Sequence, residues 1–178
     1  LLNIMTERKV APFIHIATPH IESVLNGSQA RYYNDTRVAV SKMGVITFIS
    51  TLKAIKDTMD VQTVLMDRFI PSEVVYSRVY GRPTDEKWFD EMLWDMSVSF
   101  ELYIVYVDRS DATIQAALYN KYQKNDADKM YNNLDRVRKG YKAYLLERAS
   151  WQTLKVVEVS TESYDDAISQ VLKGVFGV

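Results

Sequence analysis

Two adjacent opposite charges, Asp67 and Arg68, follow an apolar run in the segment VLMDRFIPSEVVYSRVY, residues 64–80. The apolar run is typical of a buried strand. Charges directly after such a strand lie at the carboxyl edge of a parallel sheet, where open α/β folds bind their ligands. Phosphoryl transfer needs an acidic residue that directs Mg²⁺ and basic residues that neutralise phosphate. The pair is therefore a candidate for that chemistry, and the alternative is a helix cap with a surface ion pair.

The elements that must position this pair alternate along the chain. Apolar runs predict strands at 12–17, 63–66, 102–107 and 154–159. Apolar residues at helical spacing predict helices at 1–9, 33–59, 71–80, around Trp88, twice within 112–148, and at 164–176. Strict alternation implies a parallel sheet with right-handed crossovers. We therefore predict an α/β fold with three layers, in a single domain that covers residues 1–178.

Composition bounds the class of protein. The 178 residues are 47% hydrophobic and 25% charged, as in an ordinary globular domain, and no apolar run is long enough for a membrane span. With 22 basic and 23 acidic residues there is no overall field that would gather nucleic acid. The absence of Cys excludes disulfides and thiolate metal sites, and it fits a reducing, cytoplasmic setting. His15 and His20 are the only imidazoles, so we expect no structural metal.

The pattern D-R-F-x-x-S-x-x-V-Y within residues 64–80 resembles the Asp-Arg motif of the thymidylate kinase and deoxynucleoside kinase branch of P-loop kinases. Small, divergent members of this kind are also carried by DNA phages. The resemblance implies ATP and Mg²⁺ as cofactors and a parallel sheet with the strand order 2-3-1-4-5. It also implies that Asp67 acts as a base or directs the water of the Mg²⁺ ion, and that Arg68 holds the acceptor.

The phosphate-binding loop of that family is not found in the sequence. The six glycines stand apart and never form G-x-x-x-x-G-K-[ST]. Residues 1–9, LLNIMTERK, look like the helix that follows such a loop. We therefore expect about 15 to 20 further residues upstream of Leu1, enough for one short strand and the loop. This first strand would lie at the centre of the sheet.

The resemblance also implies residues that bind the acceptor. Ser72 and Tyr76 share a face of the helix after Arg68, and Tyr76 could stack on a base or simply pack in the core. A monophosphate acceptor needs a further cation near Arg68, for which Arg78 and Arg82 are candidates. The base-contacting helix of the family would begin near Tyr32, Tyr33 and Arg37. His20 lies at the position where the family has a turn with charged residues, and it is a weak candidate. His15 is expected to pack inside a strand.

A second charged segment follows the strand at 102–107. Asp108 and Arg109 repeat the arrangement of charges after a strand, and we expect Asp67 and Arg68 to face a cleft shared with one of them. Arg109 is therefore a third catalytic candidate beside Asp67 and Arg68. Residues 110–145 resemble the helical lid that closes over the donor phosphates. Lys121, Lys124 and Lys129 stand at the expected lid tip, and Lys121 and Lys124 are the candidates for phosphate contact. Arg136 and Arg138 lie where a helix of the family continues. Each of these basic residues could instead belong to a solvated helix face.

The resemblance predicts an enzyme that transfers phosphate from ATP to a deoxynucleotide, with thymidylate or a modified pyrimidine as the first choice. A nucleoside or a hydroxymethylated base in DNA is an alternative acceptor. A non-catalytic binding module on the same fold is the alternative of a different class. We expect a nucleotide as the ligand, no membrane partner, no favoured nucleic-acid partner and the cytoplasm as the location, in a host cell if a phage encodes the protein. A homodimer is an open alternative.

Overall fold

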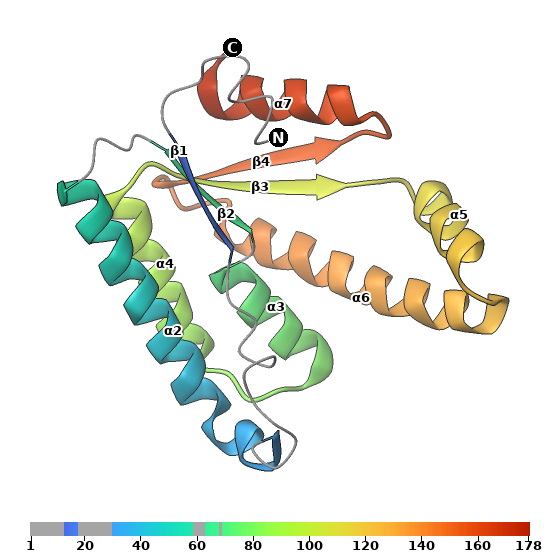
Figure 1. Cartoon of the computed structure of the whole chain (residues 1–178), viewed down its shortest axis with the longest axis horizontal. Coiled ribbons are helices and arrows are strands. Elements are labelled where there is room, and N and C mark those ends of the chain that lie inside the picture. Colours follow the sequence, from blue (N-terminus) through green and yellow to red (C-terminus); the bar gives the residue numbers. More distant parts are fainter. Residues whose placement is uncertain (1–12, 18–29, 59–62, 68) are drawn as a thin grey trace. The chain divides into compact units, whose positions relative to one another are not determined.

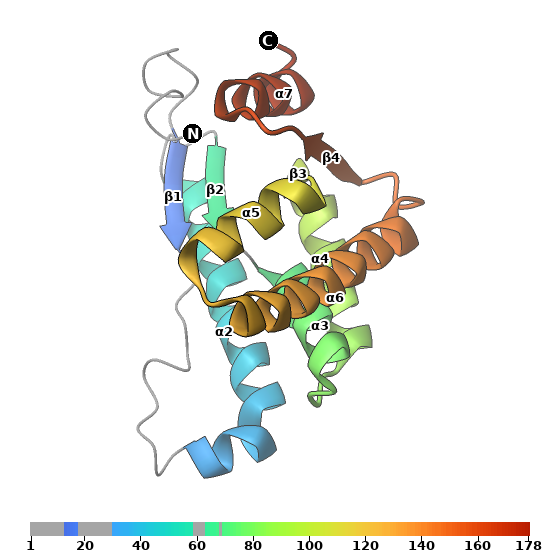
Figure 2. The same ribbon diagram turned by 90° about the vertical axis from the view of Figure 1, so that its right-hand side faces the viewer.

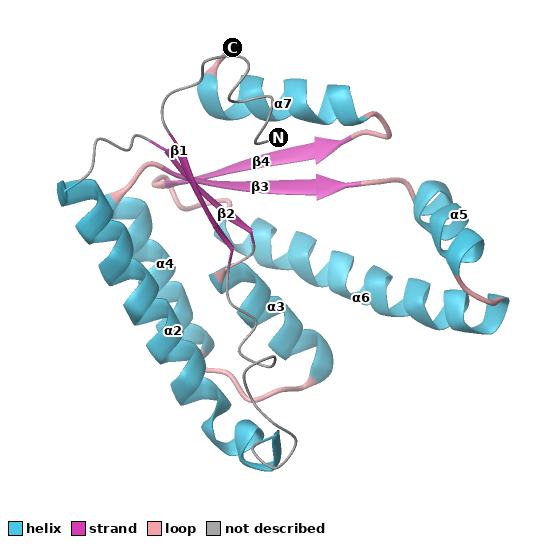
Figure 3. Ribbon diagram, in the orientation of Figure 1, coloured by secondary structure: helices cyan, strands magenta, loops and turns pink. Residues whose placement is uncertain are grey.

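A computed structural model describes residues 13–17, 30–58, 63–67 and 69–178 (Figure 1). At 13–17, 30–37, 40 and 67 it describes the backbone alone. The chain forms two compact units, Leu1–Leu93 and Trp94–Val178. Helices make up most of the described residues, and the strands form two short parallel sheets (Figure 3). The predicted α/β class with parallel strands is thus confirmed, while the five-stranded order and the single domain stay predictions.

The first unit contains a strand–helix–strand crossover. Strands β1 (Phe13–Ala17) and β2 (Thr63–Asp67) pair in parallel, with Phe13 opposite Thr63 and Ala17 opposite Asp67. Helix α2 (Ala30–Thr58) connects them, as parallel neighbours require a long crossover. These bounds confirm the predicted strands at 12–17 and 63–66 and the helix at 33–59 to within three residues. The helix expected at 1–9 lies outside the described residues.

Helix α3 (Ile70–Tyr80) begins directly after the segment that follows β2. Pro71 stands in its first turn, where the missing N–H of proline costs no helical hydrogen bond. Gly81 ends the helix in the left-handed conformation, with φ of +62°, a conformation that other L-residues rarely adopt. Ile70, Val74 and Val75 are fully buried. Their positions on one side of the helix explain why this predicted helix forms against a core.

Helix α4 (Glu86–Ser99) crosses from the first unit into the second. Two ion pairs hold its start within the first unit. Lys42 Nζ lies 2.5 Å from Asp85 Oδ2, and the Arg78 guanidinium pairs with the Glu86 carboxylate. Asp85 also accepts a hydrogen bond from the Trp88 N–H, at 3.3 Å, as an N-cap residue does.

The second unit places helices on both faces of a two-stranded sheet. Strands β3 (Leu102–Asp108) and β4 (Leu154–Ser160) are parallel, and Asp108 lies opposite Ser160. Helices α5 (Asp111–Lys121) and α6 (Lys124–Arg148) form a hairpin between them, and α7 (Tyr164–Phe176) follows (Figure 2). All of these elements agree with the prediction to within two residues.

The two faces are covered closely. A Cβ at Gly174 of α7 would lie 2.6 Å from a methyl carbon of Val157, so α7 packs against β4 at the distance that only glycine allows. On the other face, the ring of Tyr106 on β3 lies 6.0 Å from the ring of Tyr141 on α6. The buried hydrophobic residues of this unit include Met96, Ala127, Val137, Tyr144, Leu145, Leu154, Val159, Ile168, Val171 and Leu172.

At the amino ends of these strands, Arg148 is buried with 3% of its surface exposed. Its guanidinium lies 3.5 Å from the ring of Tyr144 and 5.8 Å from the ring of Trp151. Stacking on aromatic faces and the hydrogen bond to the Tyr144 carbonyl compensate the buried charge. No helix within the described part of the chain combines the length and the apolar composition needed to cross a membrane.

Candidate functional site

A hollow of about 390 Å³, open to solvent, lies at the carboxyl ends of β3 and β4. Asp108 and Ser160 are the last residues of these parallel strands, so the hollow occupies the edge at which open α/β sheets bind ligands. The ends of both strands, the two loops that follow them, the start of α5 and the middle of α6 contribute to its wall. The lining residues are Asp108, Arg109, Ser110, Asp111, Arg138, Lys142, Ser160, Thr161 and Glu162.

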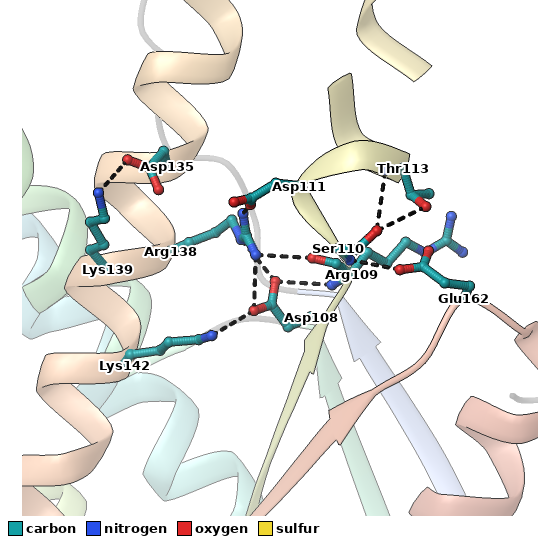
Figure 4. A network of polar contacts seen from close by, with 10 residues as sticks. All are labelled: Asp108, Arg109, Ser110, Asp111, Thr113, Asp135, Arg138, Lys139, Lys142 and Glu162. Carbon is teal, nitrogen blue, oxygen red and sulfur yellow. Dashed lines mark hydrogen bonds and ion pairs between the residues drawn. The ribbon is translucent and has the colours of Figure 1, made fainter. Parts of the chain in front are cut away.

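Asp108 is the buried centre of this site, with 7% of its surface exposed. Its carboxylate accepts hydrogen bonds from Arg138 Nε at 2.8 Å and Arg138 Nη2 at 3.1 Å (Figure 4). Lys142 Nζ lies 2.8 Å from Oδ2, and the backbone N–H of Arg109 donates to Oδ1 at 2.9 Å. A buried carboxylate is thus surrounded by two cations and a backbone donor.

The balance of these contacts keeps Asp108 ionised. Burial by itself would raise the pKa of its carboxyl group, but the hydrogen bonds from Arg138, Lys142 and the Arg109 N–H outweigh burial and lower the pKa to about 2. The pKa of Lys142 is raised, chiefly by its hydrogen bond to Asp108. Burial and the nearby charge of Asp108 raise the pKa of Tyr106, whose buried hydroxyl lies near Arg138 without a hydrogen bond of ordinary geometry.

Arg138 connects three separate acceptors. Besides Asp108 it binds the carboxylate of Asp111 through Nη1 and the backbone carbonyl of Arg109 through Nη2, at 2.9 Å. The hydrogen bond from Arg138 lowers the pKa of the Asp111 carboxyl group. Asp111 stands in the first turn of α5, where a negative charge is favoured by the helix dipole. The planar, five-donor guanidinium of arginine suits this bridge.

The loop after β4 closes the other side of the site. Glu162 Oε1 accepts a hydrogen bond from the Ser110 backbone N–H at 2.7 Å. Hydrogen bonds from Thr113 and Ser110 lower the pKa of the Glu162 carboxyl group. Ser110 is the N-cap of α5, and its hydroxyl accepts from the Thr113 N–H at 3.2 Å. The start of α5 is therefore held by its own cap and by a residue from another loop.

The Asp-Arg pair of the sequence motif lies in the first unit. Asp67 is the last residue of β2, as the motif predicts, and two residues separate it from the start of α3. Arg68 and His20 lie outside the described residues. His15 falls within β1 and Tyr32, Tyr33 and Arg37 fall within α2, where the backbone alone is described. The binding roles of all these residues stay predictions.

The other acceptor candidates are carried by α3 and the loop after it. The backbone N–H of Ser72 donates to the Phe69 carbonyl at 2.9 Å, in the first turn of α3. Tyr76 stacks on Tyr80, with ring centres 5.9 Å apart, and the Arg82 guanidinium lies 5.3 Å from the Tyr80 ring. Arg78 pairs with Glu86, so a phosphate would have to compete with that carboxylate.

Lys121 and Lys124, the predicted lid-tip residues, stand at the turn between α5 and α6. At 1.5 Å rise per residue, Lys121 is about 15 Å along α5 from Asp111, so it lies far from the hollow. Lys121 Nζ is 5.4 Å from the ring of Tyr122. The turn is secured by the hydrogen bond from the Tyr119 hydroxyl to Asp128, at 2.6 Å.

The cations that reach the hollow come from the middle of α6. Sequence alone does not single out Lys142 or Glu162 as site residues. The spacing i, i+4 of Arg138 and Lys142 is the signal that places both on one helix face. Glu162 carries no comparable signal, because it lies in a loop whose position only the sheet register determines.

Comparison of the chain with family models, curated proteins and solved structures found no match. Within the described parts of the chain, no three or more His, Cys, Asp or Glu side chains form a group that could hold a metal ion.

Proposed function

We propose that the protein transfers phosphate from ATP to a deoxynucleotide, with thymidylate or a modified pyrimidine nucleotide as the acceptor. The observation that carries this proposal is the hollow at the carboxyl ends of β3 and β4, with Arg109, Arg138 and Lys142 in its wall. Phosphoryl transfer depends on positioned cations and backbone donors rather than on covalent chemistry by the protein. The hydroxyls of Ser110, Ser160 and Thr161 add polar partners for phosphate or sugar.

The pairing of the strands supports the same proposal. In the order 2-3-1-4-5 of the P-loop nucleotide kinases, the second strand pairs with the third and the fourth with the fifth. The chain has the corresponding parallel pairs, β1 with β2 and β3 with β4. The lid would be the α5–α6 hairpin, which is compatible with α5 having no buried residue along its fully described length.

Mg²⁺ would neutralise charge on the transferred phosphate. Asp108 does not fit a Mg²⁺ site, because its carboxylate already accepts hydrogen bonds from Arg138, Lys142 and the Arg109 N–H. The proposal therefore assigns the metal, through water, to Asp67. Asp67 would also accept the proton of a hydroxyl acceptor, and Arg68 would hold the acceptor in line with the donor phosphate.

A coupled assay of ADP release tests the function. Protein with any upstream segment included is incubated with ATP, Mg²⁺ and a panel of deoxynucleoside monophosphates, nucleosides and DNA containing hydroxymethylated bases. We expect release with a pyrimidine monophosphate and weaker release with the others. If no acceptor causes ADP release, the proposal is contradicted. If only a nucleoside or only DNA causes release, the reaction is still phosphoryl transfer, but the acceptor is that nucleoside or DNA rather than a monophosphate.

A binding module without catalysis is the second candidate. The observation in its favour is that Arg138 and Lys142 are both hydrogen-bonded to Asp108, so these two cations already serve the fold. Fold alone does not fix function. Titration calorimetry with ATP and Mg²⁺ separates the two candidates, since a kinase must bind the triphosphate and a loopless binding module has no need to do so.

A further inference from the structure

The backbone around Arg109 is held by side chains from three different elements. Asp108 of β3 accepts the Arg109 N–H at 2.9 Å, and Arg138 of α6 donates to the Arg109 carbonyl at 2.9 Å. Glu162, in the loop after β4, accepts the next N–H, that of Ser110, at 2.7 Å. Both peptide groups that flank the Arg109 Cα are therefore fixed.

The side chain of Arg109 is used differently from those around it. Arg138 keeps 19% of its side chain exposed and is bound to two carboxylates. Arg109 is exposed, and its side chain extends away from Arg138, toward Glu162 (Figure 4). It is also part of the wall of the hollow. A fixed backbone thus presents an exposed guanidinium at a ligand-binding edge.

We propose that Arg109 is the anion-contacting residue of this hollow and that Arg138 is a positioning residue that acts through the backbone of Arg109. The anion is a phosphate group, which guanidinium binds through two parallel hydrogen bonds. Binding by a loop residue costs conformational entropy when the loop must be ordered first. The hydrogen bonds from Arg138 and to Glu162 order this loop before the ligand arrives.

The role of Arg138 requires arginine rather than any cation. Its guanidinium meets acceptors in three directions, on Asp108, Asp111 and the Arg109 carbonyl. An ammonium group is a single point charge on a flexible stem and cannot keep all three bonds in that planar arrangement. Arg138→Lys therefore keeps the charge of the site but loses the support of the loop.

The inference rests on the proposed function for the identity of the ligand, but its test does not need turnover. Inorganic triphosphate is titrated into the full chain by calorimetry at low salt. We expect Arg109→Ala to weaken binding by about 10-fold or more and Arg138→Lys by about 5-fold, as for a lost charge-assisted pair and a loosened loop. The double variant should bind about as weakly as Arg109→Ala, because Arg138 acts only through Arg109.

Lys139→Gln is the matched control. Lys139 is the next residue on α6, is exposed and pairs with Asp135, so its loss removes one positive charge without touching the loop. We expect a change of about twofold or less. If Arg138→Lys fails to fold, Glu162→Asp tests the same loop from the other side. It keeps the charge but shortens the reach to the Ser110 N–H, and binding should weaken as for Arg138→Lys.

Three results overturn the inference: no binding by the wild-type protein, unchanged affinity in Arg109→Ala, or effects of the two single variants that multiply in the double variant. The proposed function fails separately. If triphosphate binding depends on Arg109 and Arg138 in a protein that phosphorylates no acceptor, this result supports the inference and contradicts the proposed kinase function. Turnover that neither variant alters supports the kinase and overturns the inference.

Discussion

Arg138 donates two hydrogen bonds to the carboxylate of Asp108, from Nε at 2.8 Å and from Nη2 at 3.1 Å, across 30 residues of sequence. Asp108 ends β3 and Arg138 lies in the middle of α6, so this contact fixes the helical hairpin to the edge of the sheet that would bind a ligand. Lys142 adds a second cation to the same carboxylate. The network thus links the stability of the second unit to the shape of the hollow.

Asp108→Asn should destabilise the fold. The substitution leaves Arg138 and Lys142 facing a neutral amide, and removing one partner of a buried ion pair costs several times more than an exposed pair is worth. We expect the free energy of unfolding to fall by about 2–4 kcal/mol in urea titrations. Asp135→Asn, which removes the partner of the exposed Lys139, is the control and should cost about 0.5 kcal/mol or less. Equal losses in both variants would show that the Asp108 network contributes little.

The contribution of Asp108 should depend on pH with a defined sign. Its pKa in the folded protein is lowered to about 2 from an ordinary value of 3.8. The ionised form therefore stabilises the fold fully above pH 3.8, and this stability is lost as the pH falls through about 2. The difference in unfolding free energy between wild type and Asp108→Asn should shrink between these values. A difference that stays constant from pH 5 to pH 2 would contradict the assignment.

Gly174→Ala should destabilise the second unit although alanine is the better helix former. The gain in helix propensity is about 1 kcal/mol, but the added methyl would lie 2.6 Å from a methyl carbon of Val157. We expect a net loss of about 1–2 kcal/mol in thermal unfolding. The double variant Gly174→Ala with Val157→Ala should recover the clash energy. Failure of the second substitution to restore any stability would mean that the packing of α7 does not depend on this contact.

Asp67→Asn should lower turnover without changing the fold. If Asp67 directs the metal or accepts a proton, its loss reduces kcat by about 10²-fold or more. The melting temperature should stay within about 2 °C of wild type, as expected if Asp67 acts on the metal or the proton rather than on the fold. Steady-state kinetics and a melting curve on the same preparation test this. Full activity in the variant would make Asp67 a capping residue only.

The α5–α6 turn should respond to nucleotide if it is a lid. Replacing Lys121 and Lys124 together by Ala should lower turnover more than stability, because these charges would meet phosphate only in the closed state. Hydrogen exchange of residues 119–129 should slow when ATP, Mg²⁺ and an acceptor are added. Unchanged exchange, in a protein that binds nucleotide, would identify the segment as a fixed surface hairpin.

The sequence by itself determined the order and type of the elements. Apolar runs such as LYIVYV in β3 and residues at helical spacing in α7 are local signals, so their bounds could be predicted to within one or two residues. The placement of Asp108 after a strand was predictable for the same reason. Charge patterns also indicated that the segment between β3 and β4 is a basic helical hairpin.

Only the tertiary structure decided which cations meet which carboxylates. Lys121 and Lys124 carry the same charge as Arg138 and Lys142, but the crossing of α6 over the sheet brings the second pair to Asp108. The hydrogen bond from the Ser110 N–H to Glu162 spans 52 residues and depends on the parallel register of β3 and β4. Such contacts arise from rigid elements packed at a distance in sequence, and local periodicity carries no information about them.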